Sequence, residues 1–528
     1  MGKDSATGSS HLFIAKIAST IILAVSTIAI GIFITDVDYG LYVKALIPVT
    51  TLLLFQDWGV GAALTKYSAS YRAIQEEKNL RKIIISGLAF EVITGGALTL
   101  ILLLLSNSIS ATILDQPGLE FLIAIGSITI VFAGLSAVCQ AIFVGFERMR
   151  LTGLTMVVQA VVYCALSPLL VYFGYGATGI MLGYTISYVA TGMISVLFLY
   201  IFIFRKLSPC SISRSELSSN LKTLLGYGIP LAIGLLLSGL LAQFYSFMMA
   251  YFCDVAIIGH YKIALNFAVF ITFFTVPIST VLFPAFSKLD SGNEHEVLKS
   301  VFTTSIKYTA LFSVPATIAM IVLSTPLIST LYGNKWFYSP MFLGLELIQY
   351  LFISIGSVTN STFLQGVGET KMLMKLRVVG LLSGIPLAFL LIPRLGIIGL
   401  IFSTLLASLP SLFIGIYWIW NHYKIKFDLN SSMKIITASA IAGGTTYLFL
   451  NIFVAAEWMV LTIGAILFLS VYLICAPLIG AITQSDINNL RVMLSGLGLM
   501  SKIFGIILSI VEKPLKINAK RIRIKKQK

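Results

Sequence analysis

Long apolar runs separated by short polar loops make up most of this chain. Because backbone polar groups in lipid must be satisfied within the protein, runs that reach or exceed the roughly 20 residues needed to cross a ~30 Å hydrocarbon core predict α-helices. A lipid-facing β-barrel would show alternating strands of about ten residues instead, and the sequence shows none. Fourteen runs lie near 11–35, 43–66, 83–106, 119–144, 151–174, 177–204, 222–250, 258–286, 300–325, 339–366, 372–393, 396–420, 433–454 and 457–480. The sequence therefore predicts an all-α polytopic membrane protein with about 14 transmembrane helices.

Composition supports this class and argues against several functions. Hydrophobic residues make up 58% of the chain and charged residues 11%, with a mean hydropathy of +0.96, outside the range of soluble globular proteins. The short loops leave no soluble domain large enough for an active site, so we expect no enzyme and no catalytic residues. The five cysteines and four histidines are dispersed, without metal-ligand or disulfide spacing, so we expect neither a metal site nor a cofactor.

The basic residues alternate between loops and so predict an orientation. About thirty of the 36 Lys and Arg residues fall in the even-numbered loops and the termini, which the positive-inside rule assigns to the cytoplasm. Both termini are therefore predicted to be cytoplasmic. The net charge of +15 follows from this arrangement and is not a nucleic-acid footprint.

The C-terminal end carries the densest positive charge. An apolar segment with scattered basic residues precedes the tail 513–528, which holds eight basic residues and no acid. We expect this end to lie on the membrane surface and to be attracted to anionic lipid, with docking of a protein partner as the alternative.

A weak internal repeat divides the chain. Residues 175–179 and 141–145 have counterparts about 220 positions later, at 395–399 and 362–366, and the same offset takes the first apolar run to about 228. This register predicts two homologous halves. The predicted boundaries are 1–204 for the first half, 205–221 for a cytoplasmic linker, 222–420 for the second half, 433–480 for two additional helices, and 481–528 for an amphipathic segment and basic tail.

Seven short motifs suggest a family. They are Asp38-Tyr39-Gly40-Leu41-Tyr42, the stretch 56–67, Tyr227-Gly228-Ile229-Pro230, Ile258-Gly259-His260-Tyr261, and the stretches 283–288, 331–336 and 364–371. With these, the chain resembles polysaccharide-biosynthesis flippases of the Wzx type, in the multidrug/oligosaccharidyl-lipid/polysaccharide exporter superfamily, over about 11–480. One departure concerns span seven, where relatives often carry an acidic residue and this chain has Tyr245-Ser246.

The resemblance implies a fold and a substrate class. It implies two six-helix bundles facing each other in a V, with two extra C-terminal helices, and a central cavity lined by spans one, two, seven and eight. It further implies a cell-membrane flippase that moves a polyprenyl or dolichyl (di)phosphate-linked oligosaccharide from the cytoplasmic to the outer face by alternating access. This architecture can work as a monomer.

Ionisable and polar side chains in the implied cavity are the candidate substrate-binding residues, because charge at membrane depth is costly and usually functional. These residues are Lys16, Lys44, Lys262, Asp57, Gln243, Tyr245 and Asn266. The lysines either attract the diphosphate as it passes or extend to the nearest interface. For Asp57 we favour an ion pair with Lys16 over a role in an intracellular gate. Outside this set, Glu91, Lys307 and Glu346 are either ligands of a coupling ion or members of pairs inside a bundle, and we favour the pairs.

Two other functions fit the sequence less well. A cation-coupled multidrug exporter of the same superfamily would call for acidic groups in the binding lobe, whereas span one holds Lys16 and no acid. A membrane glycosyltransferase or polymerase would need catalytic groups gathered on a large outer loop, and the longest predicted outer loops, 107–118 and 331–339, lack such a cluster.

Overall fold

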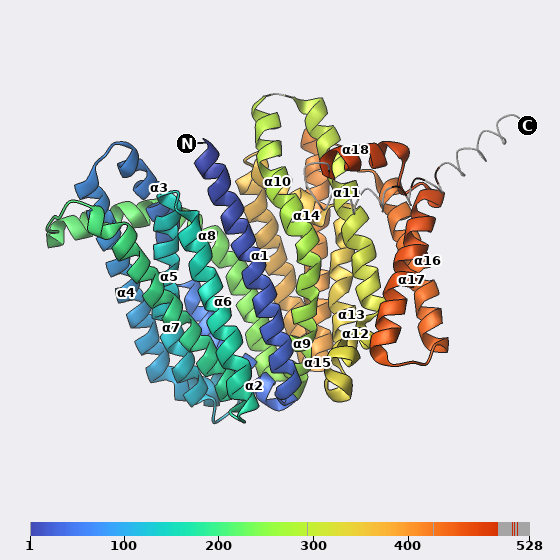
Figure 1. The fold of residues 1–528 in the computed structure, drawn as a ribbon, viewed down its shortest axis with the longest axis horizontal. Coiled ribbons are helices and arrows are strands. Elements are labelled where there is room, and N and C mark those ends of the chain that lie inside the picture. Colours follow the sequence, from blue (N-terminus) through green and yellow to red (C-terminus); the bar gives the residue numbers. More distant parts are fainter. Residues whose placement is uncertain are drawn as a thin grey trace, which may run out of the picture. The chain divides into compact units, whose positions relative to one another are not determined.

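The computed structural model describes residues 2–292, 294–425 and 427–494, together with Ser509, Glu512 and Leu515. Every regular element in these residues is helical (Figure 1). The described chain divides into two compact units. Unit 1 comprises 1–262 and 384–400, and unit 2 comprises 263–383 and 401–528. Most of the predicted amphipathic segment and basic tail, 495–528, lies outside the described residues.

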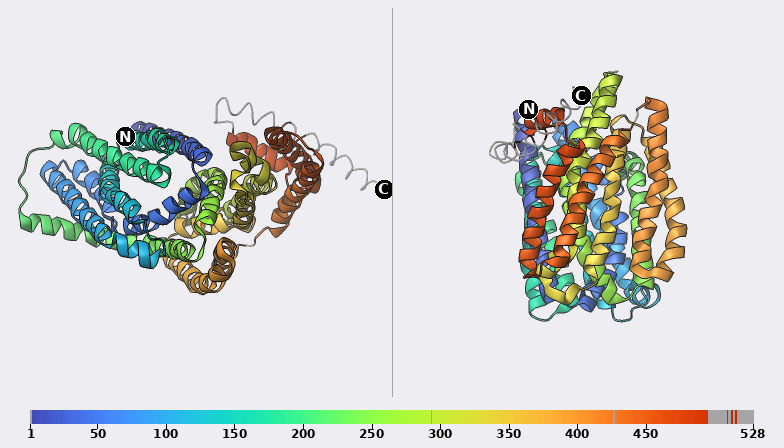
Figure 2. Two further views of the ribbon diagram at one scale, coloured as in Figure 1. Left: turned by 90° about the horizontal axis from the view of Figure 1, so that it is seen from below. Right: turned by 90° about the vertical axis from the view of Figure 1, so that its right-hand side faces the viewer.

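Unit 1 is built mainly from the first eight helices. These are α1 (Gly2–Phe33), α2 (Asp36–Leu54), α3 (Val60–Ala73), α4 (Glu77–Ser108) with its π-helical end η1 (Ile109–Ile113), α5 (Glu120–Gly145), α6 (Met149–Tyr172), α7 (Gly176–Phe202), the short η2 (Phe204–Lys206) and α8 (Arg214–Phe252). Helices α4, α5, α6 and α7 run side by side, and α1 packs along α6 (Figures 1 and 2). Unit 1 also takes in the start of α9 (Val255–Ala268).

Unit 2 holds most of the remaining elements. These are η3 (Val269–Ile271), α10 (Thr272–Ser291), α11 (His295–Val322), α12 (Ser324–Tyr332), η4 (Gly333–Trp336), α13 (Ser339–Leu347), η5 (Ile348–Ile355), α14 (Ser357–Gly366), α15 (Thr370–Tyr423), α16 (Leu429–Ile452), α17 (Glu457–Ile479) and α18 (Gln484–Leu494). The stretch 384–400 of α15 belongs to unit 1. Helices α16 and α17 lie side by side, as the orange-red pair in Figure 1.

The fold class is confirmed, but the count of fourteen spans is not. Within the described residues, ten helices are long and apolar enough to cross a membrane, or twelve if each of two bent pairs counts as one span. The predicted run 43–66 is split, because α2 ends at Leu54 and α3 begins at Val60. The element α15 covers the runs 372–393 and 396–420, but its backbone leaves helical geometry at Gly396 (φ 57°, ψ −131°), so it consists of two helices that meet at a kink where the two runs meet. Hydropathy locates apolar length and did not reveal the break between α2 and α3.

Each unit has its own apolar core. In unit 1, one core brings together α3, α4, α5, α7 and α8, with Leu64, Ile84, Phe143 and Leu224 all inaccessible to solvent. In unit 2, one core joins α11 to α16, α17 and α18. Within the membrane such side chains stabilise each unit through close packing, because lipid tails are as apolar as the core.

An ion pair fixes α18 against the core of unit 2. Lys307 Nζ on α11 lies 2.6 Å from Asp486 Oδ2 on α18, and only 17% and 8% of these side chains are exposed. The backbone N–H and the hydroxyl of Thr483 also donate to Asp486 Oδ2, each at 2.7 Å. Lys307 therefore belongs to a pair inside the protein, which was the favoured of the two sequence-based interpretations.

Replacing Asp486 with asparagine is expected to destabilise unit 2 by about 3 kcal/mol, because it leaves the Lys307 charge buried without its counter-charge. The loss is measured as the change in free energy of unfolding in mixed micelles. Glu296→Gln serves as the control, since Glu296 pairs with Lys299 at an exposed site and its loss should leave stability unchanged. Equal stabilities for Asp486→Asn and the wild type would contradict a structural role for this pair.

Candidate functional site

The candidate site follows one line of contact in unit 1, which we call the α2–α8 seam: α2 and α3 on one side, α8 and the start of α9 on the other. At the start of α2 the two backbones nearly touch. A Cβ atom added to Gly40 would lie 1.8 Å from the carbonyl oxygen of Val255, and one added to Gly259 would lie 2.3 Å from that of Asp36. His260 Nε2 lies 3.7 Å from the Asp36 carboxylate. Only glycine fits at both crossing positions.

Hydrogen bonds join the middle of the seam. The hydroxyls of Thr50 and Thr51 on α2 both point to Gln243 Oε1 on α8, at 3.5 and 3.1 Å. Tyr245, two residues further along α8, is buried, and its hydroxyl has no hydrogen-bond partner among the described residues. The seam thus combines polar side chains that sequence reasoning assigned to the cavity.

The third set of contacts along the seam lies at the break between α2 and α3. Gly59 caps α3 in the left-handed region (φ 78°), and a Cβ atom there would lie 2.2 Å from the carbonyl oxygen of Gly228. Beyond it, the rings of Tyr67 and Tyr227 meet edge to face at 6.1 Å, and Lys66 Nζ lies 4.0 Å from the centre of the Tyr227 ring. Four of the motifs that carry the family resemblance therefore meet in pairs along the seam.

Lys44 is the buried cation of α2. Only 3% of the residue is exposed, and the carboxylates of Asp115 and Asp254 are the acidic groups near enough to attract its ammonium. Lys44 therefore lies close to the loop that joins α8 to α9. A buried ammonium group such as that of Lys44 can bind an anionic ligand, which would take the place of the nearby Asp115 and Asp254 carboxylates.

Sequence reasoning missed a cluster of tyrosines on α2, α6 and α7 in unit 1. Tyr39 and Tyr42 stack on α2 with ring centres 6.2 Å apart. Tyr42 is within hydrogen-bonding reach of Tyr163 on α6, whose ring meets Tyr184 on α7 at 6.3 Å, and Tyr184 meets Tyr188 at 5.0 Å. Tyrosines combine an apolar face with a hydroxyl, which suits contact with sugar rings. The spacing of Tyr39 with Tyr42 and of Tyr184 with Tyr188 was the available signal, because it places each pair on one helix face.

The other predicted site residues lie apart from this group. Lys16 is exposed on α1, which packs against α6. Asp57 is exposed in the break, where its Oδ1 accepts a hydrogen bond of 2.7 Å from the Gly61 N–H, and the described residues show no ion pair between it and Lys16. Asp57 therefore caps α3, contrary to the favoured pairing. Lys262 is half-buried at the end of the first stretch of unit 1, and Asn266 is half-buried in unit 2.

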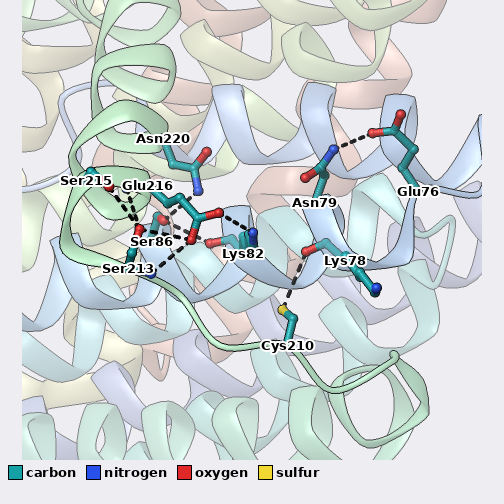
Figure 3. Close-up of polar contacts among 10 residues, drawn as sticks. All are labelled: Glu76, Lys78, Asn79, Lys82, Ser86, Cys210, Ser213, Ser215, Glu216 and Asn220. Carbon is teal, nitrogen blue, oxygen red and sulfur yellow. Dashed lines mark hydrogen bonds and ion pairs between the residues drawn. The ribbon is translucent and has the colours of Figure 1, made fainter.

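The predicted linker, 205–221, lies within unit 1 and is held against the start of α4. Ser213 and Glu216 form a reciprocal cap at the beginning of α8, and Glu216 also accepts a hydrogen bond from Lys82 on α4 (Figure 3). Asn220 donates to the Ser86 hydroxyl at 3.3 Å. Upstream, Cys210 Sγ approaches the carbonyl oxygen of Lys78 (Figure 3). The backbone N–H of Ser208 donates to Glu77, and Arg81 donates to the carbonyl oxygen of Leu207. These contacts hold the linker and the start of α8 against α4.

Beside the linker lies a cavity of about 480 Å³ with basic walls. Arg72, Arg148 and Lys206 line it, together with aromatic residues and Glu77. Two of these cations are oriented by the backbone, since Arg72 donates to the carbonyl oxygen of Phe146 and Arg148 to that of Phe202. Three cations around one opening favour the approach of an anionic head group.

Comparisons with known proteins agree with the fold and with the motifs. The model of a family described as "Polysaccharide biosynthesis protein" matches residues 10–340. The chain is 21% identical to the uncharacterized membrane protein MJ1068 of Methanocaldococcus jannaschii over 70% of this chain and 75% of that protein. It is 24% identical to the probable low-salt glycan biosynthesis flippase Agl15 of Haloferax volcanii, over 47% of this chain and 53% of that protein.

Two groups of solved structures share the fold. The inward closed structure of the lipid II flippase MurJ superposes with a TM-score of 0.71 and 17% identity, covering 88% of this chain and 97% of that one. An inward-facing multidrug resistance MATE transporter of the MOP superfamily superposes with a TM-score of 0.63 and 17% identity, covering 78% and 98%. At this identity the likeness concerns the fold.

Proposed function

The chain belongs to the polysaccharide biosynthesis protein family, whose model matches more than half of its length, and on that premise we propose that it flips an isoprenoid-linked oligosaccharide across the membrane. The substrate is a polyprenyl or dolichyl (di)phosphate carrying a glycan, moved from the cytoplasmic to the outer face by alternating access. The names of the similar glycan flippase and of the lipid II flippase support this class of substrate. No bond is made or broken in this task.

The observation that carries the proposal is the buried charge of Lys44 in unit 1, and a tyrosine cluster of the same unit adds hydrogen-bonding faces. A (di)phosphate sugar has an anionic, hydroxyl-rich head that lipid rejects. A protein that moves it must therefore offer a cation and hydrogen-bonding aromatic faces inside the membrane. Buried Lys44 supplies the charge, and the tyrosines of α2, α6 and α7 supply the faces. The basic cavity beside the linker offers a place for the head group to gather before entry.

The proposal includes a setting in the cell. The charge distribution of the loops supports a cell-membrane protein with both termini in the cytoplasm. The basic C-terminal tail rests on anionic lipid. A single copy of the chain suffices for transport, because α2, α6 and α7 all belong to one unit.

The proposal is tested in proteoliposomes. Purified protein is reconstituted with a polyprenyl diphosphate oligosaccharide that carries a fluorescent sugar, and the fraction quenched from outside is followed over time. Protein-dependent equilibration of the inner-leaflet pool is the expected result. If a correctly folded protein produces no equilibration, with cation gradients tried in both directions, this substrate is wrong. Export of cationic drugs from the same vesicles then tests the multidrug alternative, which the likeness to MATE transporters brings in.

A further inference from the structure

Glu91 is a carboxyl group buried in the middle of a transmembrane helix. It lies 14 residues after the start of the 32-residue helix α4, about 21 Å along an axis of about 48 Å at 1.5 Å per residue. None of its surface is exposed. Its burial comes from neighbouring protein, because α3, α5 and α8 pack against α4.

Neither carboxylate oxygen of Glu91 has a hydrogen-bond partner in the part of the chain that the structure describes. The nearest amide, that of Gln56, lies beside it but donates at 2.6 Å to the carbonyl oxygen of Ile130. Sequence analysis grouped Glu91 with Lys307 and Glu346, and both of these have partners. Lys307 pairs with Asp486, and Glu346 accepts a hydrogen bond from Gln349. Of these three, Glu91 alone has neither an ion pair nor a hydrogen bond of normal geometry in the described structure, and the Gln56 amide is the polar group beside it.

A glycine makes room for this group. A Cβ atom added to Gly134 on α5 would lie 1.7 Å from Gln56 Nε2 and 2.3 Å from Glu91 Oε2. The side chains of Gln56 and Glu91 therefore fill the place where any other residue on α5 would put its own side chain. Gln56 itself lies in the break between α2 and α3, and interrupted membrane helices are the places where transporters hold ions.

The charged groups of the surrounding elements leave Glu91 uncompensated. The acidic group that acts on it is Asp57, which is negative itself. The ionisable side chains of α5 are Glu120 in its first turn and Cys139. The basic residues of α4 lie at least nine residues before Glu91, and Lys82 among them is engaged by Glu216. The basic residues of α8, Arg214 and Lys222, are exposed. On α3, Lys66 lies over Tyr227 and Arg72 contacts Phe146 and Glu147.

We propose that Glu91, with Gln56 beside it, binds a small monovalent cation, a proton or Na⁺, and that its loading and release are coupled to transport. A buried carboxylate without a counter-charge is too costly to persist, so a cation must neutralise it. The coupling rests on the proposed flippase function. The structural path from Glu91 to the seam is short, because Gln56 lies three residues before Gly59, where α3 meets α8. Binding a cation at Glu91 therefore changes the charge next to the break between α2 and α3 in the α2–α8 seam.

Binding is measured first, without transport. Infrared difference spectra on a pH change detect a proton on a buried carboxyl, and radioactive ²²Na⁺ detects sodium on the purified protein. We expect one of these signals in the wild type and its loss in Glu91→Gln. Glu120→Gln is the matched control, since Glu120 accepts hydrogen bonds from Gly118 and Ser110 and should not affect the signal. Equal signals in the wild type and Glu91→Gln, or neither signal in the wild type, would overturn the site.

Stability separates ion binding from a structural role. An amide costs less to bury than a carboxylate, so Glu91→Gln should unfold at the wild-type temperature or above. A lower unfolding temperature with unchanged ion binding would mean that Glu91 only supports packing. Gly134→Ala gives a second route to the same site, because the added methyl group meets both polar side chains; it should reduce ion binding.

Coupling is measured in the proteoliposomes. With an imposed proton or Na⁺ gradient, the wild type should accumulate labelled oligosaccharide in one leaflet beyond equal distribution. Glu91→Gln should reach only equal distribution, and the gradient that drives the wild type identifies the ion. Wild-type accumulation by Glu91→Gln would refute the coupling. If neither protein moves the oligosaccharide under any gradient, the flippase proposal fails, while the binding measurement still decides whether the cation site exists.

Discussion

Replacing Gly59 with alanine is expected to abolish transport and to lower the stability of unit 1. The residue has a φ of 78°, a left-handed conformation that costs other residues about 1–2 kcal/mol. The new Cβ would also lie 2.2 Å from the carbonyl oxygen of Gly228, and such overpacking costs about 1–3 kcal/mol more. Thermal unfolding in detergent and the rate of sugar quenching in proteoliposomes measure the two effects.

Gly96→Ala is the matched control for this substitution. Gly96 lies in the helix α4, where an added Cβ would meet no atom within 4 Å. Alanine there should stabilise the helix by about 0.5–1 kcal/mol and leave transport unchanged. A Gly59→Ala protein that matches the wild type in both assays would mean that the close contact between α3 and α8 is not needed.

Replacing Lys44 with glutamine is expected to slow flipping by at least about tenfold. A hydrogen bond to a charged group contributes about 1.5–3 kcal/mol, and every 1.4 kcal/mol corresponds to about a factor of ten in affinity. Glutamine keeps most of the length of the side chain but removes the charge that would meet the diphosphate. The initial quenching rate at limiting substrate measures the effect.

Two further variants define what the Lys44 result means. Arg394→Gln removes an exposed cation of α15 and should leave the rate unchanged. Lys44→Arg keeps the charge and should retain more activity than Lys44→Gln. Equal rates for Lys44→Gln and Arg394→Gln would remove Lys44 from the path of the substrate.

The architecture was predictable from sequence because hydropathy and charge act over whole segments. Apolar runs of the required length predicted helices, and helices are what the described chain contains. The motifs predicted the family, which the family model confirms. The break at 55–59 was not predicted, because Gln56 and Asp57 interrupt the run 43–66 too briefly to divide it by hydropathy and a left-handed glycine does not change hydropathy. The polar pair Gln56-Asp57 followed by Gly59 was the visible signal.

The candidate site was predictable in its residue types and less so in its contacts. Lys44 and Gln243 were selected as polar groups in apolar runs, but the bond from Thr51 to Gln243 depends on how α2 meets α8. Asp57 was expected to pair with Lys16, yet α1 packs along α6 while Asp57 binds its own helix start. From the sequence, Glu91 and Lys307 had the same two interpretations: a ligand of a coupling ion or a member of an ion pair inside a bundle. Only tertiary packing distinguishes a paired charge from an unpaired one.

The docked linker has a consequence for how the protein is made. Residues 207–220 contact α4 through Leu207, Ser208, Cys210, Glu216 and Asn220. Because these partners all precede α9 in the chain, they are synthesised before most of unit 2 exists. During translation, α8 can therefore dock on the completed first half while the ribosome is still producing the rest, and α8 need not wait for the helices that follow it.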